Sequence, residues 1–238
     1  MLSPTYIPNL DAILHGGLMQ RSSILIAGPT GSGRTVTCLH SLFKAAKAGE
    51  KCVYITVLSE PVNKLLEIAQ NYSFFDDEVL KCGNLKLLEL DREILTKGDY
   101  ATLKYFHTLA QDNPDRVVID PATLLLCISP SFEDGRELLP LEKRSFCVNL
   151  FRAFEASNTI LVVTADLTAS EISNSILSHL SDVVIELGDR DQRSNEERRY
   201  LRVIKSRGRG FFAGKHDLEL SFNGSSVASK NLPDIEIS

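Results

Sequence analysis

The chain lacks the features that mark secreted, membrane and metal-clustered proteins. It has five cysteines in 238 residues, and no two are spaced as Cys-x-x-Cys, which argues against a disulfide framework or a zinc site. No apolar run approaches the roughly 20 residues that span a bilayer. No basic segment followed by an apolar one opens the chain, as a secretion signal would. We therefore expect buried thiols in a reducing compartment and a cytoplasmic protein without a membrane partner.

The chain also lacks an excess of basic residues. Lys and Arg number 26 against 31 Asp and Glu, which gives a formal net charge of −5. An acidic chain has no general electrostatic attraction for DNA or RNA. Apolar residues make up 43% of the sequence, enough to bury the core of one large domain. With no internal repeat visible, we expect a single domain over residues 1–225 and a flexible tail over residues 226–238.

Short apolar runs alternate with longer amphipathic segments. The runs are rich in Val, Ile and Leu, as strands covered on both faces are, and they span Ser22–Ala27, Cys52–Val57, Leu85–Leu90, Arg116–Asp120, Thr159–Thr164 and Asp182–Leu187. The helices expected between and after them span Thr35–Ala48, Pro61–Asn71, Tyr100–Asp112, Glu137–Ala156 and Ala169–Leu180. Strands alternating with helices predict an α/β fold with a mostly parallel twisted sheet flanked by helices.

The C-terminal part has a different pattern. Tyr200–Lys205 and Leu218–Phe222 alternate polar with apolar residues, and the glycine-rich segment Gly208–Gly214 lies between them. This pattern predicts antiparallel strands added to the parallel sheet. The charged run Gly188–Arg199 is expected to form a solvated hairpin tip.

The segment from Gly28 to Thr35 is a candidate phosphate-binding loop. It reads Gly28, Pro29, Thr30, Gly31, Ser32, Gly33, Arg34 and Thr35, between an expected strand and an expected helix, which is the context that a P-loop requires. Glycines let backbone N–H groups turn toward phosphate oxygens, and a helix start adds free donors and the positive end of its dipole. Arg34 stands where lysine is usual; it keeps the charge but is bulkier and forked.

Asp120 is a candidate partner of Thr35 in binding Mg²⁺. It ends the apolar strand Arg116–Asp120, about 85 residues after the P-loop. Because the carboxyl ends of parallel strands border the same crevice, Asp120 is expected to face the P-loop. An acid there can hold Mg²⁺ through water, and the hydroxyl of Thr35 can ligate it directly. The sequence therefore predicts ATP and Mg²⁺ as ligands, with Thr35 and Asp120 at the metal.

Several segments resemble motifs of KaiC and of RecA- and RadA-like ATPases. In chain order they are Asn9–Leu18, which precedes the P-loop strand; Asp120–Thr123, the end of the second acid's strand; Val162–Asp166, a strand that ends near the γ-phosphate; and Ile204–Gly208 with Gly214–Leu220, which resemble the KaiC ending. The matches run in order over residues 8–220. The resemblance implies a RecA-type domain of the KaiC family in single-domain form.

The resemblance also implies an assembly. KaiC-like proteins form hexameric rings or filaments with ATP at subunit boundaries. The resemblance therefore implies a homo-oligomer, with a hexamer as one such assembly. Lys205 and Arg207 would then reach in trans to the γ-phosphate of a neighbouring subunit's nucleotide and serve in catalysis there.

Two features depart from the family pattern. Arg34 replaces the loop lysine, and Leu58 and Ser59 stand where most relatives carry adjacent glutamates, one of which activates the attacking water. Glu60 comes one residue late, and such a shift can move a carboxylate beyond the roughly 3 Å reach of a general base. Glu60 stays the candidate catalytic acid, although it is equally suited to the N-terminus of the next helix. Hydrolysis is therefore expected to be weak or absent.

The leading hypothesis is an ATP-binding regulatory or assembly module with an unidentified protein partner. One alternative is an active oligomeric ATPase that works on a partner protein. Another is a recombinase-like, DNA-binding relative, against which the candidate pore loop Ser129–Leu139 counts. It carries Glu133, Asp134 and Glu137 against Arg136, whereas contacts with phosphates need a positive excess.

Overall fold

The structure is a computed structural model that describes residues 2–90, 92–127, 139–189 and 198–228. The strands are β1 Leu2–Ser3, β2 Leu18–Met19, β3 Ser23–Gly28, β4 Cys52–Thr56, β5 Leu85–Glu89, β6 Arg116–Asp120, β7 Ile160–Asp166, β8 Val183–Asp189, β9 Arg199–Ser206, β10 His216–Ser221 and β11 Gly224–Val227. The helices are α1 Leu10–Ile13, α2 Arg34–Lys47, α3 Val62–Gln70, α4 Asp77–Lys81, α5 Arg92–Thr96, α6 Asp99–Gln111, α7 Pro140–Glu155, α8 Ala169–Ile172 and α9 Ile176–Leu180, with the 3-10 helix η1 Ala122–Leu126.

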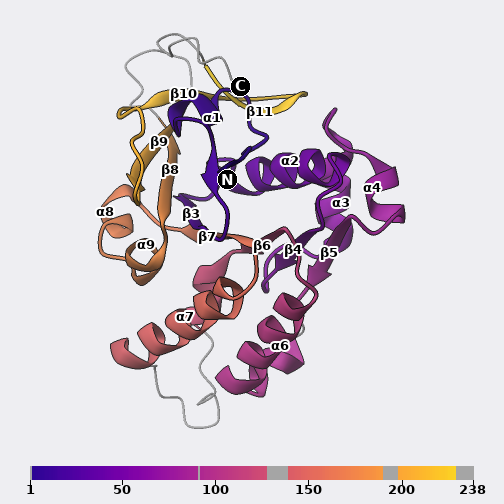
Figure 1. Cartoon of the computed structure of the whole chain (residues 1–238), viewed down its shortest axis with the longest axis vertical. Helices are drawn as coiled ribbons and strands as arrows, with labels where there is room; N and C mark the ends of the chain where they lie inside the picture. The colour runs from indigo at the N-terminus through magenta and orange to yellow at the C-terminus, as the bar shows by residue number, and fades with distance from the viewer. Residues whose placement is uncertain (1, 91, 128–138, 190–197, 229–238) are drawn as a thin grey trace.

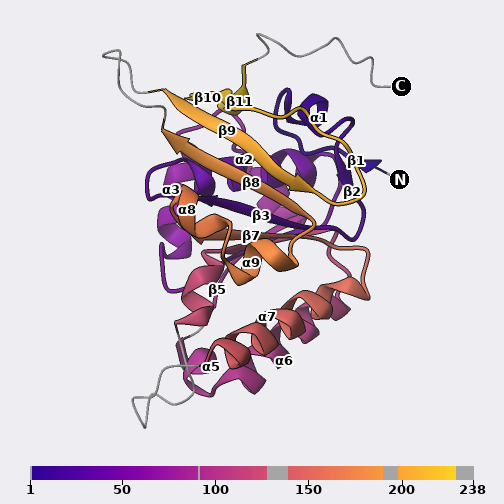
Figure 2. The ribbon, with the colours of Figure 1, turned by 90° about the vertical axis from the view of Figure 1, so that its left-hand side faces the viewer.

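A nine-stranded sheet in the order β11-β10-β9-β8-β3-β7-β6-β4-β5 crosses the molecule (Figure 1). The strands from β8 to β5 run parallel to one another. The strands β9, β10 and β11 are antiparallel additions at one side, visible along the upper part of Figure 2. The α/β fold class and the antiparallel C-terminal strands predicted from the sequence are confirmed.

The parallel strands are covered on both faces, as their apolar composition predicts. Alternate residues of β3 belong to opposite sides. Ile24 and Ile26 pack with residues of α2, and Leu25 and Ala27 pack with residues of α6 and α7. Figures 1 and 2 show α2 and α3 apart from the pair formed by α6 and α7. The P-loop therefore leaves a strand that is held from both faces.

Two expectations about helix and strand limits need correction. The stretch Ala169–Leu180 is two short helices, α8 and α9, because it contains a second start signal. Ser175 caps α9 by accepting a hydrogen bond from the Ser178 N–H at 3.0 Å, and a side-chain cap favours a new helix start. The chain is also still in a strand at residue 226, because β11 pairs with β10 as far as Val227, whose side chain is buried.

The expected tail from residue 226 thus begins inside β11, and residues 229–238 lie outside the described residues. The N-terminal part of the expected helix Glu137–Ala156, before residue 139, also falls outside them. So do the candidate pore loop, apart from its last residue, and the tip of the β8–β9 hairpin. Among the described residues, no helix is both long enough and apolar enough to cross a bilayer.

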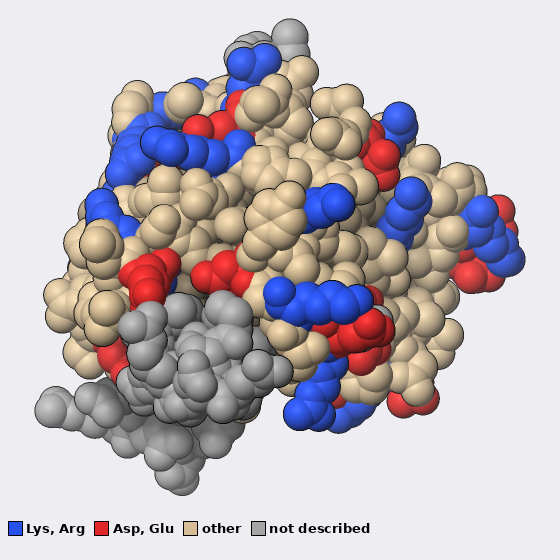
Figure 3. All heavy atoms as spheres, turned by 90° about the horizontal axis from the view of Figure 1, so that it is seen from below, with Lys and Arg blue, Asp and Glu red and all other residues tan. Residues whose placement is uncertain are grey.

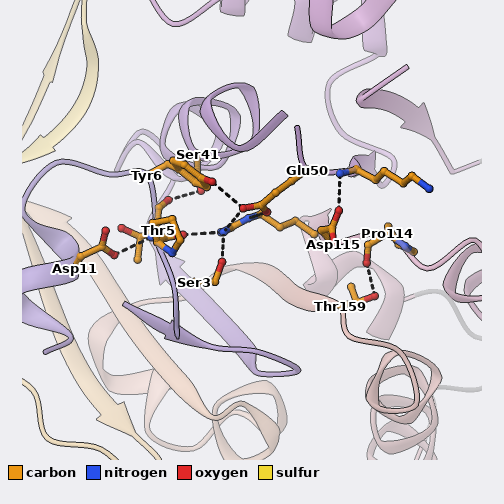
Figure 4. A network of polar contacts seen from close by, with 12 residues as sticks. Ser3, Thr5, Tyr6, Asp11, Ser41, Glu50, Pro114, Asp115 and Thr159 are labelled. Atoms are coloured by element: carbon orange, nitrogen blue, oxygen red, sulfur yellow. Dashed lines mark hydrogen bonds and ion pairs between the residues drawn. The ribbon is translucent and has the colours of Figure 1, made fainter. Parts of the chain in front are cut away.

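A buried arginine ties the N-terminal segment to the start of β6. The guanidinium of Arg116 contacts the Glu50 carboxylate at 2.5 Å and 3.1 Å, and it donates to the Ser3 hydroxyl and the Pro4 carbonyl, each at 2.7 Å. Tyr6 places its ring under the same guanidinium and donates its hydroxyl proton to Glu50 at 2.8 Å. Figure 4 shows this network of polar contacts. Burial and the hydrogen bond with Glu50 raise the pKa of Tyr6 to about 12.

Candidate nucleotide site

The loop Gly28–Thr35 connects β3 to α2 at the carboxyl edge of the parallel strands. Gly31 and Gly33 have φ angles of +84° and +97°, which residues with a Cβ disfavour. Gly28 is required for a different reason, since a Cβ there would lie 2.3 Å from the Leu187 carbonyl oxygen. The loop glycines therefore supply both the turn and the close approach to the neighbouring strand.

The two residues predicted to hold Mg²⁺ lie together. The Thr35 hydroxyl donates to the Asp120 carboxylate at 2.9 Å. The Tyr54 and Thr164 hydroxyls donate to the same carboxylate from β4 and β7. Burial, with the nearby Asp120 charge, holds the pKa of Tyr54 well above its usual value, so Tyr54 stays a proton donor.

The residues present suit a magnesium ion. Hydroxyl and carboxylate oxygens are the donors that Mg²⁺ prefers, and it keeps several waters and phosphate oxygens as well. Asp120 is buried, and no lysine or arginine among the described residues forms an ion pair with it. A buried carboxylate without a cation is costly, so a bound cation would relieve that cost. The described part of the chain has no cluster of three or more His, Cys, Asp or Glu side chains that could hold a metal ion.

Arg34 leans toward an acid at the end of β7. Its Nη2 lies 3.7 Å from Oδ1 of Asp166, and the Thr30 hydroxyl donates to Oδ2 of Asp166 at 2.8 Å. The Arg34 side chain is 12% exposed, and its buried Nη1 has no hydrogen-bond partner within the described residues. The Ser32 hydroxyl is likewise buried without a partner there. Unpaired buried donors are rare, and phosphate oxygens would satisfy both.

The segment after β4 borders the site but presents no free acid. The Val57 N–H donates to the Asp120 carbonyl at 2.9 Å, which places this segment beside the second acid. Leu58, in a left-handed conformation with φ +46°, is 46% exposed. The Glu60 carboxylate pairs with Lys64 of α3 at 2.7 Å. The structure therefore places Glu60 in an ion pair at the start of a helix.

Lys205 and Arg207 lie at the other edge of the sheet from the P-loop. Ser206 of β9 is opposite Val183 at the start of β8, whereas the loop follows the end of β3, which is parallel to β8. The Lys205 Nζ donates to the Ser178 carbonyl at 2.5 Å, and Arg207 Nη2 donates to the His179 carbonyl at 2.8 Å. Burial and the Arg207 charge lower the pKa of Lys205. One subunit therefore does not bring these two residues to its own loop.

Four residues of the site were not assigned by sequence reasoning. Thr164 and Asp166 lie in a stretch noted only for its resemblance, and Tyr54 is embedded in an apolar run. Arg199 starts β9 and donates from Nε to the Gly31 carbonyl at 3.4 Å, a contact that no local pattern signals. Thr164 and Asp166 had a usable signal, because polar residues at the end of a parallel strand face the same crevice as the P-loop.

A family model described as ATPase KaiC matches residues 3–231. The chain belongs to the KaiC family. It is 25% identical over 241 residues to UPF0273 protein PH0284 of Pyrococcus horikoshii, covering 92% of this chain and 91% of that protein. It is 25% identical over 243 residues to a UPF0273 protein of Thermotoga maritima, covering 92% and 93%.

A solved structure of the KaiC-like protein PH0186 from Pyrococcus horikoshii matches the fold with a TM-score of 0.77 and 21% identity. That match covers 96% of this chain and 99% of the other. The family membership expected from the ordered motifs is confirmed, and with it a RecA-fold, nucleotide-binding protein.

Proposed function

We propose that this protein binds ATP with Mg²⁺ at Gly28–Thr35, hydrolyses it slowly or not at all, and acts as a regulatory or assembly module. The observation that carries the proposal is the meeting of Thr35 and Asp120 at 2.9 Å, at the helix start that follows the loop. Free N–H groups at a helix start bind anions. The Ser32 hydroxyl and Arg34 Nη1, which have no hydrogen-bond partner among the described residues, are two further donors.

Each part of the site has a role in this proposal. The backbone N–H groups of the loop and the Arg34 guanidinium hold the phosphates. Thr35 and Asp120 hold Mg²⁺, which neutralises charge on the β- and γ-phosphates when bound. Tyr54 and Thr164 fix the orientation of the Asp120 carboxylate through their hydroxyls.

Slow hydrolysis is proposed because the segment after β4, where most relatives carry the water-activating glutamates, presents no free acid among the described residues. The segment next to Asp120 offers Leu58 and Ser59, and the Glu60 carboxylate is paired with Lys64. General-base assistance is worth roughly 10²–10⁴ in rate, so its loss raises the barrier by about 3–5 kcal/mol. Binding need not weaken in proportion, because the base acts on water and not on the bound phosphates.

Assembly is the proposed role of Lys205 and Arg207. Arg207 lines a cleft of about 310 Å³ at the edge where the parallel strands begin. The lining also contains Arg21, Arg152 and the acids Glu155 and Asp182, and Arg207 lies 3.5 Å from the Asp182 carboxylate. Ser23 and Gly28 are five residues apart along β3, so this edge lies roughly 17 Å from the loop of the same subunit. If a second subunit meets this edge, Lys205 and Arg207 would contact the γ-phosphate of the nucleotide bound to that subunit. An arginine supplied in trans stabilises the charge on this phosphate.

The partner proposed is a protein and not DNA. On the face in Figure 3, a group of Lys and Arg side chains at the upper left is accompanied by Asp and Glu side chains elsewhere, and the chain carries a formal net charge of −5, which gives no general attraction for a phosphate backbone. The five cysteines are all free thiols, in keeping with a reducing compartment, and we propose the cytoplasm.

Nucleotide titration tests the binding site. Mg-ATP at millimolar concentration is expected to raise the melting temperature by mass action and to give a measurable heat of binding. Thr35→Ala and Asp120→Asn are expected to weaken binding in the presence of Mg²⁺, with Glu67→Gln on α3 as a control. An unchanged melting temperature and no binding heat for the wild type would refute the proposal. Unchanged Mg-ATP affinity in both variants would remove the assigned metal roles.

Turnover tests the hydrolysis claim. Phosphate release is expected to rise in Arg34→Lys and in Ser59→Glu, and most in the double variant, because the two substitutions act on different steps. The control is Glu60→Ala, which is expected to leave the low rate unchanged. Wild-type hydrolysis at roughly the 1–100 s⁻¹ typical of kinases, abolished by Glu60→Ala, would make Glu60 the base and overturn this part.

Sedimentation tests assembly. A non-hydrolysable ATP analogue is expected to give larger species than ADP, because ADP lacks the γ-phosphate that Lys205 and Arg207 would contact. Alanine at either position should remove the difference between nucleotides, whereas Lys104→Ala on α6 should keep it. A protein that stays monomeric with both nucleotides at high concentration would contradict the role in trans.

A further inference from the structure

One carboxylate holds two residues of the nucleotide loop. Asp166 is the last residue of β7 and lies opposite Gly28 in the sheet. It accepts a hydrogen bond from the Thr30 hydroxyl at 2.8 Å and lies 3.7 Å from Nη2 of Arg34. The hydrogen bond with Thr30 holds the first half of the loop, and the ion pair with Arg34 holds the positively charged residue of the loop. Asp166 is therefore placed to respond to whatever occupies the loop.

The position of Arg34 locates this acid relative to a bound nucleotide. The cation at this position of a P-loop reaches the β- and γ-phosphates. The Arg34 side chain is 12% exposed, so its guanidinium head is largely buried, and Nη1 has no hydrogen-bond partner in the described part of the chain. Asp166 lies next to the Arg34 guanidinium, at the end of β7 and beside β3, the strand that leads into the loop. It would therefore face the terminal phosphate of a nucleotide bound there.

We propose that Asp166 sets the nucleotide preference of the site and favours a nucleoside diphosphate over a triphosphate. The inference rests on the proposed function, because it places the nucleotide in the same loop. A diphosphate can use the free Nη1 of Arg34 while the contact between Asp166 and Arg34 persists. A triphosphate brings a further anionic group beside the Asp166 carboxylate, and like charges at close range oppose binding.

The preference also links the site to assembly. Within one subunit, the loop cation Arg34 is already shared with Asp166, and Arg199 contacts the Gly31 carbonyl. Lys205 and Arg207 of a neighbouring copy would supply the missing positive charge. Triphosphate binding is then expected to be weak in isolated subunits and stronger in an assembly.

The test is a titration of ADP and of a non-hydrolysable ATP analogue, each with Mg²⁺, against wild type and Asp166→Asn at a protein concentration where both are monomeric. Asp166→Asn is expected to tighten the analogue roughly tenfold, the size of a repulsion between partly exposed charges, and to change ADP affinity much less. Asp112→Asn removes one negative charge at the far edge of the sheet and is expected to leave both affinities unchanged. Melting temperatures without nucleotide establish that the variants are folded.

Two further variants keep the proposal testable if Asp166→Asn is unstable. Asp166→Ser also removes the charge and is expected to relax the preference. Thr30→Val removes the hydrogen bond but keeps the carboxylate, so the preference for ADP should remain. If the ratio of the two affinities is the same in wild type and in the neutral variants, the proposal is wrong.

The remaining outcomes separate this inference from the proposed function. If Asp166→Asn abolishes turnover and leaves the affinity ratio unchanged, Asp166 acts in the chemistry and does not set the preference. If wild type and all variants give no heat with either nucleotide, the loop is not a nucleotide site, and both proposals fail. If wild type binds nucleotide but prefers the triphosphate, only the inference about Asp166 fails.

Discussion

Glu50→Ala is expected to lower the free energy of unfolding by about 3 kcal/mol, because it leaves a buried cation without its counter-charge. The Arg116 side chain is 3% exposed, and Glu50 is its ion-pair partner among the described residues. Breaking such a pair costs roughly 3–5 kcal/mol. The lower end applies here because Ser3 and Pro4 still accept hydrogen bonds from Arg116, and because water has partial access to the site of Glu50.

Thermal unfolding measures this effect. For a chain of this length, 1 kcal/mol shifts the melting temperature by about 2–4 °C, so the expected fall is roughly 6–12 °C. Glu67→Ala on the exposed face of α3 is the control and should change the melting temperature little. The double variant Arg116→Met with Glu50→Leu is expected to be more stable than Glu50→Ala, because no charge is then left buried.

Two results would refute this reasoning. One is a loss below about 1 kcal/mol for Glu50→Ala, the range of exposed ion pairs. The other is a double variant whose loss equals the sum of the losses of Arg116→Met and of Glu50→Leu measured singly, since residues in direct contact should couple. Either would mean that the network of Figure 4 positions the N-terminal segment without contributing this stability.

Two more predictions concern the loop and the C-terminal strand. By urea unfolding, Gly33→Ala is expected to lower the free energy of unfolding by about 2 kcal/mol and Gly31→Ala by about 1 kcal/mol. Both positions need a positive φ, but of the two only Gly33 would bring its Cβ against another side chain, Leu220, at 2.6 Å. Equal losses in the two variants would contradict this reasoning. Burial lowers the pKa of His40, which packs against Ser225 of β11, so below about pH 6.5 the unfolded chain binds more protons. The melting temperature should therefore fall between pH 7 and pH 5, and His40→Gln should lessen that fall; the same slope in both proteins would exclude His40 as its source.

The P-loop and the second acid could be predicted from the sequence because their chemistry restricts residue type and order. A phosphate loop needs glycines at fixed positions, and parallel strands bring their carboxyl ends to one crevice. From these two facts Thr35 and Asp120 were expected to share a site, and they lie within hydrogen-bond distance. Glu60 was open to two interpretations, and the contact with Lys64 is the one that a helix-start acid makes.

Hydrogen bonds between side chains of neighbouring strands could not be predicted in the same way, because they depend on the register in which the strands pair. Tyr54 reaches Asp120 because β4 and β6 pair with Tyr54 opposite Val118 and Thr56 opposite Asp120. A shift of one residue would turn Tyr54 to the other face of the sheet. Nothing in the apolar run around Tyr54 fixes that register, so its hydroxyl could be assigned to the site only from the structure.

The antiparallel run of β9 gives a physical reason for a role in trans that the sequence supplied only by resemblance. Gly188 near the end of β8 is opposite Tyr200, and Val183 at its start is opposite Ser206. The first residue of β9, Arg199, therefore lies at the loop of its own subunit, where it contacts the Gly31 carbonyl. Arg207 follows eight residues later, roughly 25 Å away along an extended strand, at the opposite edge. If subunits stack edge to edge, β9 starts with a basic residue at the loop of its own subunit, and Arg207 directly after β9 lies at the edge that would meet a neighbour's loop. A change in phosphate charge at one loop would then act on Arg199 of that subunit and on Arg207 of the neighbouring one.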